Sequence, residues 1–366
     1  MATNQDEIPV TLLTGYLGAG KSTLVDYILK ADHGYKVAVC MNDFGDTTDI
    51  ESRALTINDP VTGEQTSAFL TLPNGCLCCS FKDLGIAAVE DMVARQPVDW
   101  VIIELTGLAD PGPVAKSFWT NEEMGDLELD AVVCVIDGRN VLKQISEPTL
   151  QRQIALADLL LLNKTDLITS SSDLTTIESR IRSLNPSAPL RRTERSRADL
   201  SSLFRVGAYS GGAQRGIGTL LDSSSTDNHN NQTHEHDHQH DENCSHDHQI
   251  SHHHKPHYDG ITTISISLPP LSPDKFKALN TFLQDTLWEP HGPHGPEILR
   301  TKGLVVTTQG EEWIIQGVAD LFEVTRAAPA PNSKTGVGKD QEGKLVFIGK
   351  GVGPELARAC RHALGL

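Results

Sequence analysis

The segment Gly15–Ser22 constrains the fold more than any other part of the chain. It reads G-Y-L-G-A-G-K-S, and it stands directly after the apolar, β-branched run Val10–Thr14 and directly before the amphipathic segment Ser22–Ala31. A strand that passes through a glycine-rich loop into a helix places several backbone N–H groups and the positive end of the helix dipole at one point. The segment therefore predicts a phosphate-binding loop in an α/β fold, with a simple glycine-rich turn as the alternative.

The residues of this loop have separate expected tasks. Gly15, Gly18 and Gly20 allow backbone N–H groups to close around phosphate oxygens. Lys21 neutralises charge on the β- and γ-phosphates. Ser22 and Thr23 follow at the start of the helix, where the Ser22 hydroxyl is placed to bind Mg²⁺. We therefore expect a nucleoside triphosphate and Mg²⁺ at this loop.

Short apolar runs alternate with amphipathic segments as far as about Leu203. The chain predicts strands at Val10–Thr14, Lys36–Met41, Trp100–Glu104, Ala131–Asp137 and Leu159–Leu162, and helices at Ser22–Ala31, Leu84–Ala94 and Thr175–Leu184. Continuous apolar runs are typical of parallel strands that are buried on both faces. The predicted first domain, residues 1–221, is a doubly wound, mostly parallel α/β sheet.

A sharp change in composition follows this domain. Residues 222–257 hold 11 of the 15 histidines and only two apolar residues, so we expect a disordered His-rich insert. A smaller α+β domain is predicted at residues 258–366. Its expected strands are Ile261–Leu268, Ile298–Thr307, Glu312–Val318 and Leu345–Gly349, its helices are Pro273–Leu287 and Pro354–Leu364, and a loop covers Ala327–Gly343.

Charge and hydropathy exclude two classes of partner. The chain has 31 basic and 48 acidic side chains, a formal net charge of −17. Nucleic acids and anionic membranes attract basic surfaces, so neither is expected to bind. No stretch approaches the roughly 18 apolar residues of a membrane span, and Met1–Pro9 has no secretory signal pattern. We expect a protein of the cytoplasm, with the nucleus as a second compartment.

The sequence N-K-T-D at Asn163–Asp166 points to the identity of the base. It follows the apolar strand Leu159–Leu162, at the carboxyl edge of the sheet where open α/β folds bind ligands. A carboxylate at Asp166 can accept hydrogen bonds from both the ring N–H and the exocyclic amine of guanine, and adenine offers no such pair of donors. We therefore expect Asn163, Lys164 and Asp166 to bind GTP, with a turn or helix cap at Asp166 as the alternative.

A second nucleotide motif is predicted at the end of strand Trp100–Glu104. A carboxylate at a strand end can hold a Mg²⁺-bound water, and Gly107, three residues later, can approach the γ-phosphate without a Cβ atom. The alternative is an ordinary acid at a strand end. We expect Glu104 to assist Mg²⁺ binding together with Ser22.

Three cysteines lie within four positions in the segment P-N-G-C-L-C-C at Pro73–Cys79. Thiolates of Cys76, Cys78 and Cys79 would select a soft cation such as zinc or Cu(I), and three protein ligands leave one tetrahedral position open. The alternative is three small buried hydrophobic residues. Cys40 and Cys134 stand within apolar strands and are predicted to be core residues.

Together these motifs resemble those of the CobW-like P-loop GTPases that handle metals, and in particular their eukaryotic zinc-regulated GTPase metalloprotein activator branch. The resemblance runs from Ile8 to the C-terminus and includes N-D-F-G at Asn42–Gly45, E-L-T-G-L-A-D-P at Glu104–Pro111 and R-S-R-A-D-L at Arg195–Leu200. It implies a P-loop GTPase domain, a CobW C-terminal-type domain, zinc held by Cys76, Cys78 and Cys79, and transfer of that zinc to a client metalloprotein.

The chain departs from the family pattern in three places. Asp43 stands where the family has Glu, and Leu105 where it has Thr. The resemblance implies that Asp43, with a shorter reach, contacts metal or orients water beside the catalytic Lys21 and Glu104. The usual client in this branch is a type 1 methionine aminopeptidase, but the C-P-E-L-V-P-I docking segment is not seen in Met1–Pro9. That client is therefore a candidate without its own docking motif.

The histidines of the insert suggest weak metal sites. His234, His236, His238 and His240 alternate with polar residues, so in an extended chain they project to the same side. The alternative is a solvated linker. The expected function is a GTP-hydrolysing zinc chaperone. The alternatives are a non-catalytic zinc or nickel buffer, a GTPase that inserts another metal such as cobalt or nickel, and a P-loop kinase for a small molecule.

Overall fold

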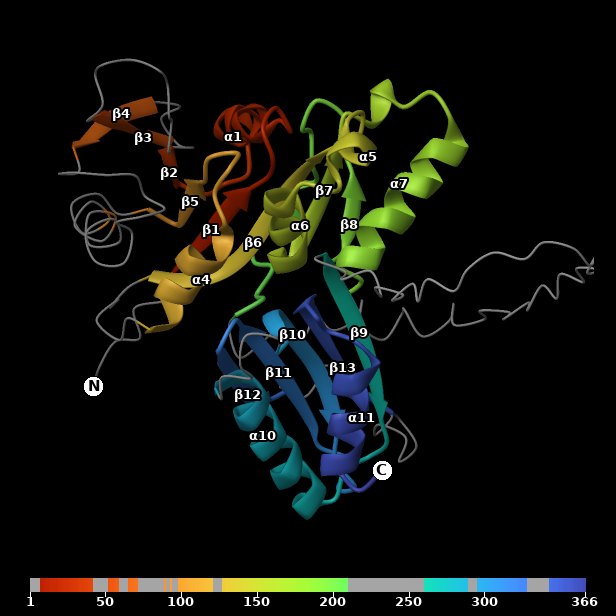
Figure 1. The fold of residues 1–366 in the computed structure, drawn as a ribbon. Coiled ribbons are helices and arrows are strands. Elements are labelled where there is room, and N and C mark those ends of the chain that lie inside the picture. Colours follow the sequence, from red (N-terminus) through yellow and green to blue (C-terminus); the bar gives the residue numbers. More distant parts are fainter. Residues whose placement is uncertain are drawn as a thin grey trace, which may run out of the picture.

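The structure, a computed structural model, describes residues 7–41, 52–58, 65–71, 89, 93, 98–120, 127–209, 260–288, 295–327 and 342–366. Figure 1 shows these residues in two bodies, each built around one sheet. No helix in the described part of the chain is long and apolar enough to cross a membrane.

The first sheet has the strand order β4-β3-β2-β5-β1-β6-β7-β8. From β2 to β8 the neighbouring strands are parallel, and β3 and β4 add an antiparallel hairpin at the edge beside β2. The strands are β1 (Ile8–Thr14), β2 (Val37–Met41), β3 (Ser52–Asn58), β4 (Gln65–Thr71), β5 (Trp100–Glu104), β6 (Leu127–Asp137), β7 (Leu159–Asn163) and β8 (Leu190–Arg192).

Burial on both faces explains why the central strands read as continuous apolar runs. All five residues of β5 and of β7 are buried, because helices cover the sheet on either side. The helices are α1 (Lys21–Lys30), α4 (Pro111–Thr120), α5 (Val141–Gln144), α6 (Pro148–Leu156), α7 (Ser171–Leu184) and α8 (Leu200–Leu203). Figure 1 shows α4 and α6 on the side of the first sheet that faces the second body.

The second sheet is antiparallel, with the strand order β12-β11-β10-β13-β9. Its helices pack on one face around a core that includes Leu279, Leu283, Phe347 and Cys360. The elements are β9 (Ile261–Leu268), α10 (Pro273–Trp288), β10 (Glu297–Val306), β11 (Glu312–Val318), β12 (Leu321–Arg326), β13 (Gly343–Lys350) and α11 (Pro354–Ala363).

The other face of the second sheet completes the core of the first body. Five buried apolar residues of the second body belong to the first core, namely Ile261, Leu299, Val318, Val346 and Ile348. Polar contacts surround them: Arg152 on α6 bonds Glu297 at 2.7 Å, and Lys116 on α4 bonds Asp320 at 2.5 Å. The apolar core of the first body therefore continues across the interface into the second sheet, while the second body keeps its own core on its other face.

A buried cluster of charges lies within this interface. Asp158, directly before β7, forms ion pairs with Arg300 and Lys302 of β10, and its Oδ2 accepts a hydrogen bond from the Val132 amide. Arg300 Nη1 donates to the Tyr209 hydroxyl at 2.8 Å. Burial alone would raise the pKa of Asp158, but the two cations outweigh it and hold that pKa below its usual range. The carboxylate therefore remains ionised between the two bodies.

The structure confirms the predicted doubly wound, mostly parallel sheet and the separate α+β body after it. Of the predicted helix Leu84–Ala94, only Val89 and Val93 are described, and both are helical and buried. The predicted insert at residues 222–257 lies outside the described residues. Nine of the described elements were not predicted: β3, β4, α4, α5, α6, β8, α8, β12 and the 3₁₀ helix Thr165–Leu167.

Candidate nucleotide site

The glycine-rich loop lies where the sequence predicts it, between the end of β1 at Thr14 and the start of α1 at Lys21. Gly20 precedes the helix with φ +109°, a conformation that side chains disfavour, and a Cβ there would lie 2.4 Å from Asn163 Nδ2. Lys21 Nζ donates to the Gly15 carbonyl at 2.8 Å across the loop. Burial lowers the Lys21 pKa, and Glu104 acts in the opposite direction.

Glu104 ends β5 beside the start of α1. Ser22 Oγ donates to Glu104 Oε1 at 3.0 Å, and the Glu104 side chain is buried. A hydroxyl and a carboxylate oxygen are the hard ligands that Mg²⁺ prefers. The two residues predicted as Mg²⁺ ligands therefore lie together, and their donor set fits that ion.

The turn after β5 lies against the phosphate-binding loop. The Leu105 amide donates to the Leu13 carbonyl at 2.9 Å, which continues the pairing of β5 with β1. The Ala109 amide donates to the Thr106 carbonyl at 3.1 Å and closes the turn. A Cβ on Gly107 would lie 2.9 Å from the amide nitrogen of Leu17. Glycine is required here because the two backbones are almost in contact.

Asn163 and Lys164 join the N-K-T-D segment to the phosphate-binding loop. Asn163 Nδ2 donates to the Ala19 carbonyl at 2.9 Å, and Lys164 Nζ donates to the Gly18 carbonyl at 2.7 Å. Asp137, at the end of β6, accepts a second bond from Lys164 Nζ at 2.8 Å. Lys164 therefore lies between an acidic side chain and the loop that receives the phosphates.

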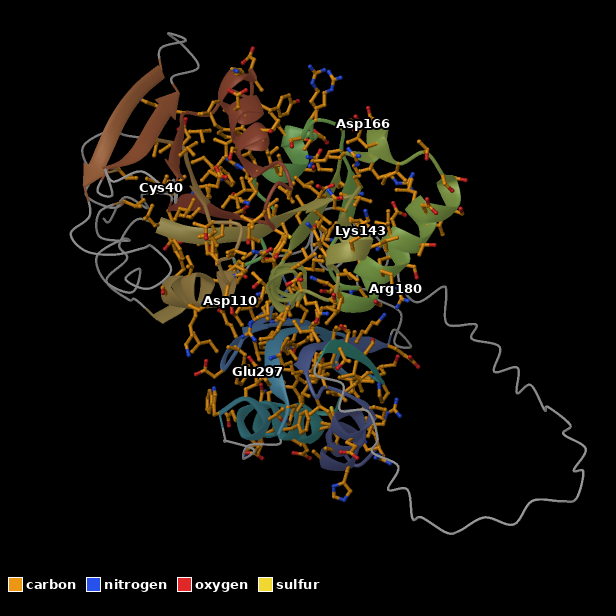
Figure 2. The ribbon with its side chains drawn as sticks, turned by 45° about the horizontal axis from the view of Figure 1, so that its top comes forward. Cys40, Asp110, Lys143, Asp166, Arg180 and Glu297 are labelled. Atoms are coloured by element: carbon orange, nitrogen blue, oxygen red, sulfur yellow. The ribbon has the colours of Figure 1, made fainter. Side chains whose placement is uncertain are left out.

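Asp166 is exposed, unlike the buried Asn163 of the same segment. It lies in a short 3₁₀ helix, Thr165–Leu167, and Figure 2 shows it at the end of the first body that is remote from the second sheet. The carboxylate is therefore accessible to a ligand. The structure thus brings together the phosphate-binding loop, Glu104, Gly107 and the N-K-T-D segment.

Ser196 also belongs to this site, although no sequence motif indicated a role for it. Its amide donates to Asn163 Oδ1 at 2.8 Å, and its hydroxyl donates to the Gly20 carbonyl at 2.9 Å. Ser196 and the preceding Arg195 both have positive φ, 57° and 51°. The R-S-R-A-D-L segment marked the region, but nothing in the sequence pattern announced this backbone conformation.

Several predicted site residues lie outside the described part of the chain. They are Asp43, Cys76, Cys78, Cys79, His234, His236, His238 and His240. Within the described residues, no group of three or more His, Cys, Asp or Glu side chains is arranged to hold a metal ion. Cys40 and Cys134 are buried, which confirms that they are core residues, and burial raises the Cys134 pKa to about 12.

Comparison with known proteins agrees with this geometry. Residues 9–192 match the CobW/HypB/UreG nucleotide-binding domain, and residues 264–360 match the cobalamin synthesis protein cobW C-terminal domain. The zinc-regulated GTPase metalloprotein activator 1 of Schizosaccharomyces pombe is 34% identical over 94% of this chain and 83% of its own length. The Saccharomyces cerevisiae protein of the same name is 32% identical over 94% and 80%.

A solved structure has the same fold. The zinc-bound YjiA GTPase from E. coli superposes with a TM-score of 0.65, with 98% of this chain and 99% of that chain covered, at 23% identity. The phosphate-binding loop, the contacts of the N-K-T-D segment and the two matched domains occur in one chain. The chain therefore belongs to the CobW/HypB/UreG family of P-loop GTPases.

Proposed function

We propose that this GTPase is a zinc chaperone that binds zinc through Cys76, Cys78 and Cys79 and transfers it to a client metalloprotein. The observation that carries the proposal is the joined nucleotide site, in which Asn163 and Lys164 bond the phosphate-binding loop. The metal specificity is supported by relatives that are named zinc-regulated activators.

We further propose residues 1–221 as the GTPase domain, 222–257 as the insert and 258–366 as the second domain.

The geometry supports a separate role for each nucleotide contact. Lys21, buried at the start of α1, would bind the β- and γ-phosphates, and their negative charge would keep its ammonium ionised despite burial. The backbone of Gly107 would meet the γ-phosphate. The exposed carboxylate of Asp166 would accept two hydrogen bonds from guanine.

Ser22 and Glu104 would hold Mg²⁺, Ser22 directly and Glu104 through a bound water. When bound, the ion would neutralise charge that develops on the β- and γ-phosphate oxygens. Ser22 Oγ and Glu104 Oε1 are within hydrogen-bond distance of each other, so the two residues that would hold the ion lie at one place.

Strand register supports a catalytic role for Asp43. In the pairing of β2 with β5, Met41 lies opposite Glu104, the last residue of β5. The described part of β2 therefore ends beside Glu104, the proposed Mg²⁺ ligand, two residues before Asp43 in the sequence. We propose that Asp43 orients the attacking water there.

The Cys segment follows β4 and precedes β5 in the chain, and both the β2 and β5 ends adjoin the nucleotide site. We propose that zinc, as cargo, and the γ-phosphate bias the same two-state segment after β2. Linkage between two ligands is reciprocal, so zinc would change GTP binding as much as GTP changes zinc binding. The histidines His234, His236, His238 and His240 would supply weak additional sites.

The test is GTP hydrolysis across a buffered series of free zinc concentrations. We compare the wild-type chain with a variant in which Cys76, Cys78 and Cys79 are serine, and with Cys360→Ala, which removes a thiol from the second core. Zinc should change wild-type and Cys360→Ala turnover and leave the triple variant unaffected.

Two other results would overturn the proposal. Zinc binding with constant turnover would indicate a metal buffer. A response to cobalt or nickel at lower free concentrations than zinc would indicate insertion of another metal.

A further inference from the structure

A buried glutamine of α6 holds the turn that contains Gly107. Gln153 is 0% exposed, and its Nε2 donates to the Gly107 carbonyl at 3.1 Å and to the Ala109 carbonyl at 3.0 Å. The two N–H groups of one amide thus satisfy two carbonyls of the same turn. None of the described strands and helices supplies a backbone partner for these carbonyls, so the glutamine substitutes for regular backbone pairing.

The turn is enclosed from opposite directions. On one side Gly107 touches Leu17 of the phosphate-binding loop, and on the other it meets Gln153. The neighbouring Arg152 reinforces the second contact, because its Nε donates to Asp110 Oδ2 at 2.7 Å, just beyond the turn. The turn therefore lies between the phosphate-binding loop and α6.

In the part of the chain that the structure describes, only the donor side of the Gln153 amide has protein partners. Within the described residues, its Oε1 is buried without a hydrogen bond, whereas both N–H groups are used. A buried acceptor without a partner lowers stability, so general stabilisation is a poor explanation for a glutamine at this position. The arrangement instead favours a specific task for the two donors.

We propose that Gln153 is a positioning residue for the γ-phosphate of GTP: by holding the Gly107 and Ala109 carbonyls, it fixes the backbone of the turn where Gly107 meets that phosphate. This inference rests on the proposed role of Gly107. Without the amide donors, the two buried carbonyls would have to turn toward water, and the Gly107 backbone would move with them. GDP has no γ-phosphate, so its binding should be almost independent of Gln153.

The test measures the affinities of GDP and of a non-hydrolysable GTP analogue for the full chain by calorimetry. Gln153→Met keeps the side-chain length and removes both donors. Gln151→Met is the matched control: it lies two residues earlier on α6, and Gln151 Nε2 donates to Ile145 rather than to the turn. Gly107→Ala, whose Cβ would collide with Leu17, reports the role of the turn itself.

Gln153→Met should weaken the GTP analogue by about tenfold or more and lower kcat, with GDP affinity changed less than about twofold. Gln151→Met should leave the affinities for the GTP analogue and for GDP unchanged. Equal weakening of both nucleotides by Gln153→Met would overturn the proposal, because it would indicate a purely structural role. The proposal would also be overturned if Gly107→Ala lost the preference for the GTP analogue over GDP while Gln153→Met kept it. That result would leave the proposed role of Gly107 intact.

If neither Gln153→Met nor Gly107→Ala changes the ratio of the affinity for the GTP analogue to the affinity for GDP, the proposed role of Gly107 fails and this inference fails with it. A second variant covers the case in which Gln153→Met does not fold. Gln153→Glu can donate one hydrogen bond as a neutral acid and none as a carboxylate, so its triphosphate preference, relative to wild type, should fall as pH rises. If the ratio of GTP-analogue affinity to GDP affinity in Gln153→Glu is independent of pH and equal to that of wild type, the proposal is overturned.

Discussion

Asp158 and Arg300 form an ion pair between the two bodies in which neither side chain is exposed to solvent. The pair is part of a larger set of bonds, because Lys302 also contacts Asp158 and the Tyr209 hydroxyl accepts from Arg300. Such a pair stabilises a fold weakly in comparison with apolar residues, but the loss of one partner leaves a buried charge. The interface is therefore sensitive to single substitutions at these positions.

Arg300→Met should lower the free energy of unfolding by about 3–5 kcal/mol, because Asp158 would keep only Lys302 as a buried cation. Urea unfolding followed by circular dichroism measures the effect. The control is Arg326→Met, which removes the exposed pair of Arg326 with Glu311 and should cost less than about 1 kcal/mol. A wild-type urea midpoint for Arg300→Met would show that the cluster does not hold the bodies together.

The stability of the protein should depend on pH through Asp130. Burial raises the pKa of Asp130 to about 6, against the opposing effect of hydrogen bonds from the Val206 and Gly207 amides. The folded state therefore holds a proton that the unfolded chain releases at lower pH. The stability that this proton contributes is complete below the unfolded pKa, about 3.9, and is lost as pH rises through about 6.

Asp130→Asn should flatten this dependence by up to about 1.4 kcal/mol for each pH unit between pH 4.5 and 6. Urea unfolding at half-unit pH steps measures the two slopes. Asp173→Asn, at an exposed position in α7, should retain the wild-type slope. Equal slopes for wild type and Asp130→Asn would mean that Asp130 titrates as an ordinary carboxyl group.

Lys21→Met should lower GTP turnover by about a hundredfold or more without unfolding the chain, because the loss is charge stabilisation rather than packing. Steady-state hydrolysis and circular dichroism distinguish the two effects. Lys30→Met is a control on the same helix, where Lys30 forms an exposed pair with Asp26. Wild-type turnover in Lys21→Met would place the phosphates at another site.

GTP should bind about tenfold or more tightly than ATP, and Asp166→Asn should reduce this preference. The asparagine amide would donate to the C2 carbonyl of xanthine, so the variant should gain affinity for xanthosine triphosphate. Calorimetry with the three nucleotides tests both expectations, with Asp173→Asn as the exposed control. Equal GTP and ATP affinities in the wild-type chain would remove the guanine assignment.

Local pattern predicted the central strands of the first sheet, because apolar runs such as Val10–Thr14 and Leu159–Leu162 form strands at the expected places, but it missed the edge strands β3, β4 and β8. It missed α4, which begins at Pro111 with glycine and a second proline in its first turn, and α6, where buried Gln153 interrupts the apolar face. These positions are decided by contacts between distant segments. The Gln153 bonds span 44 and 46 residues, and spacing along the chain carries no signal for them.

The candidate site also contains residues that sequence motifs predict and residues that depend on tertiary contacts. The sequence predicted Lys21, Ser22, Glu104 and Asn163 from motif and position, and the structure brings them together. Ser196 could not be found, because its contribution depends on a left-handed backbone that only tertiary contacts select. The roles of Asp43 and the three cysteines remain predictions.

The shared core has a consequence for how the protein is made. Asp158 and Arg300 are separated by 142 residues, and Ile261, Leu299 and Ile348 also come late in the chain. On the ribosome, the first body is synthesised before the cations and apolar side chains that cover Asp158 exist. Until β10 and β13 have emerged, the face of the first body that contacts the second sheet stays open. The Asp158 carboxylate is then exposed among apolar side chains without its two cations. The nascent GTPase domain is therefore an expected client of chaperones, and its folding is completed only by the last strands of the chain.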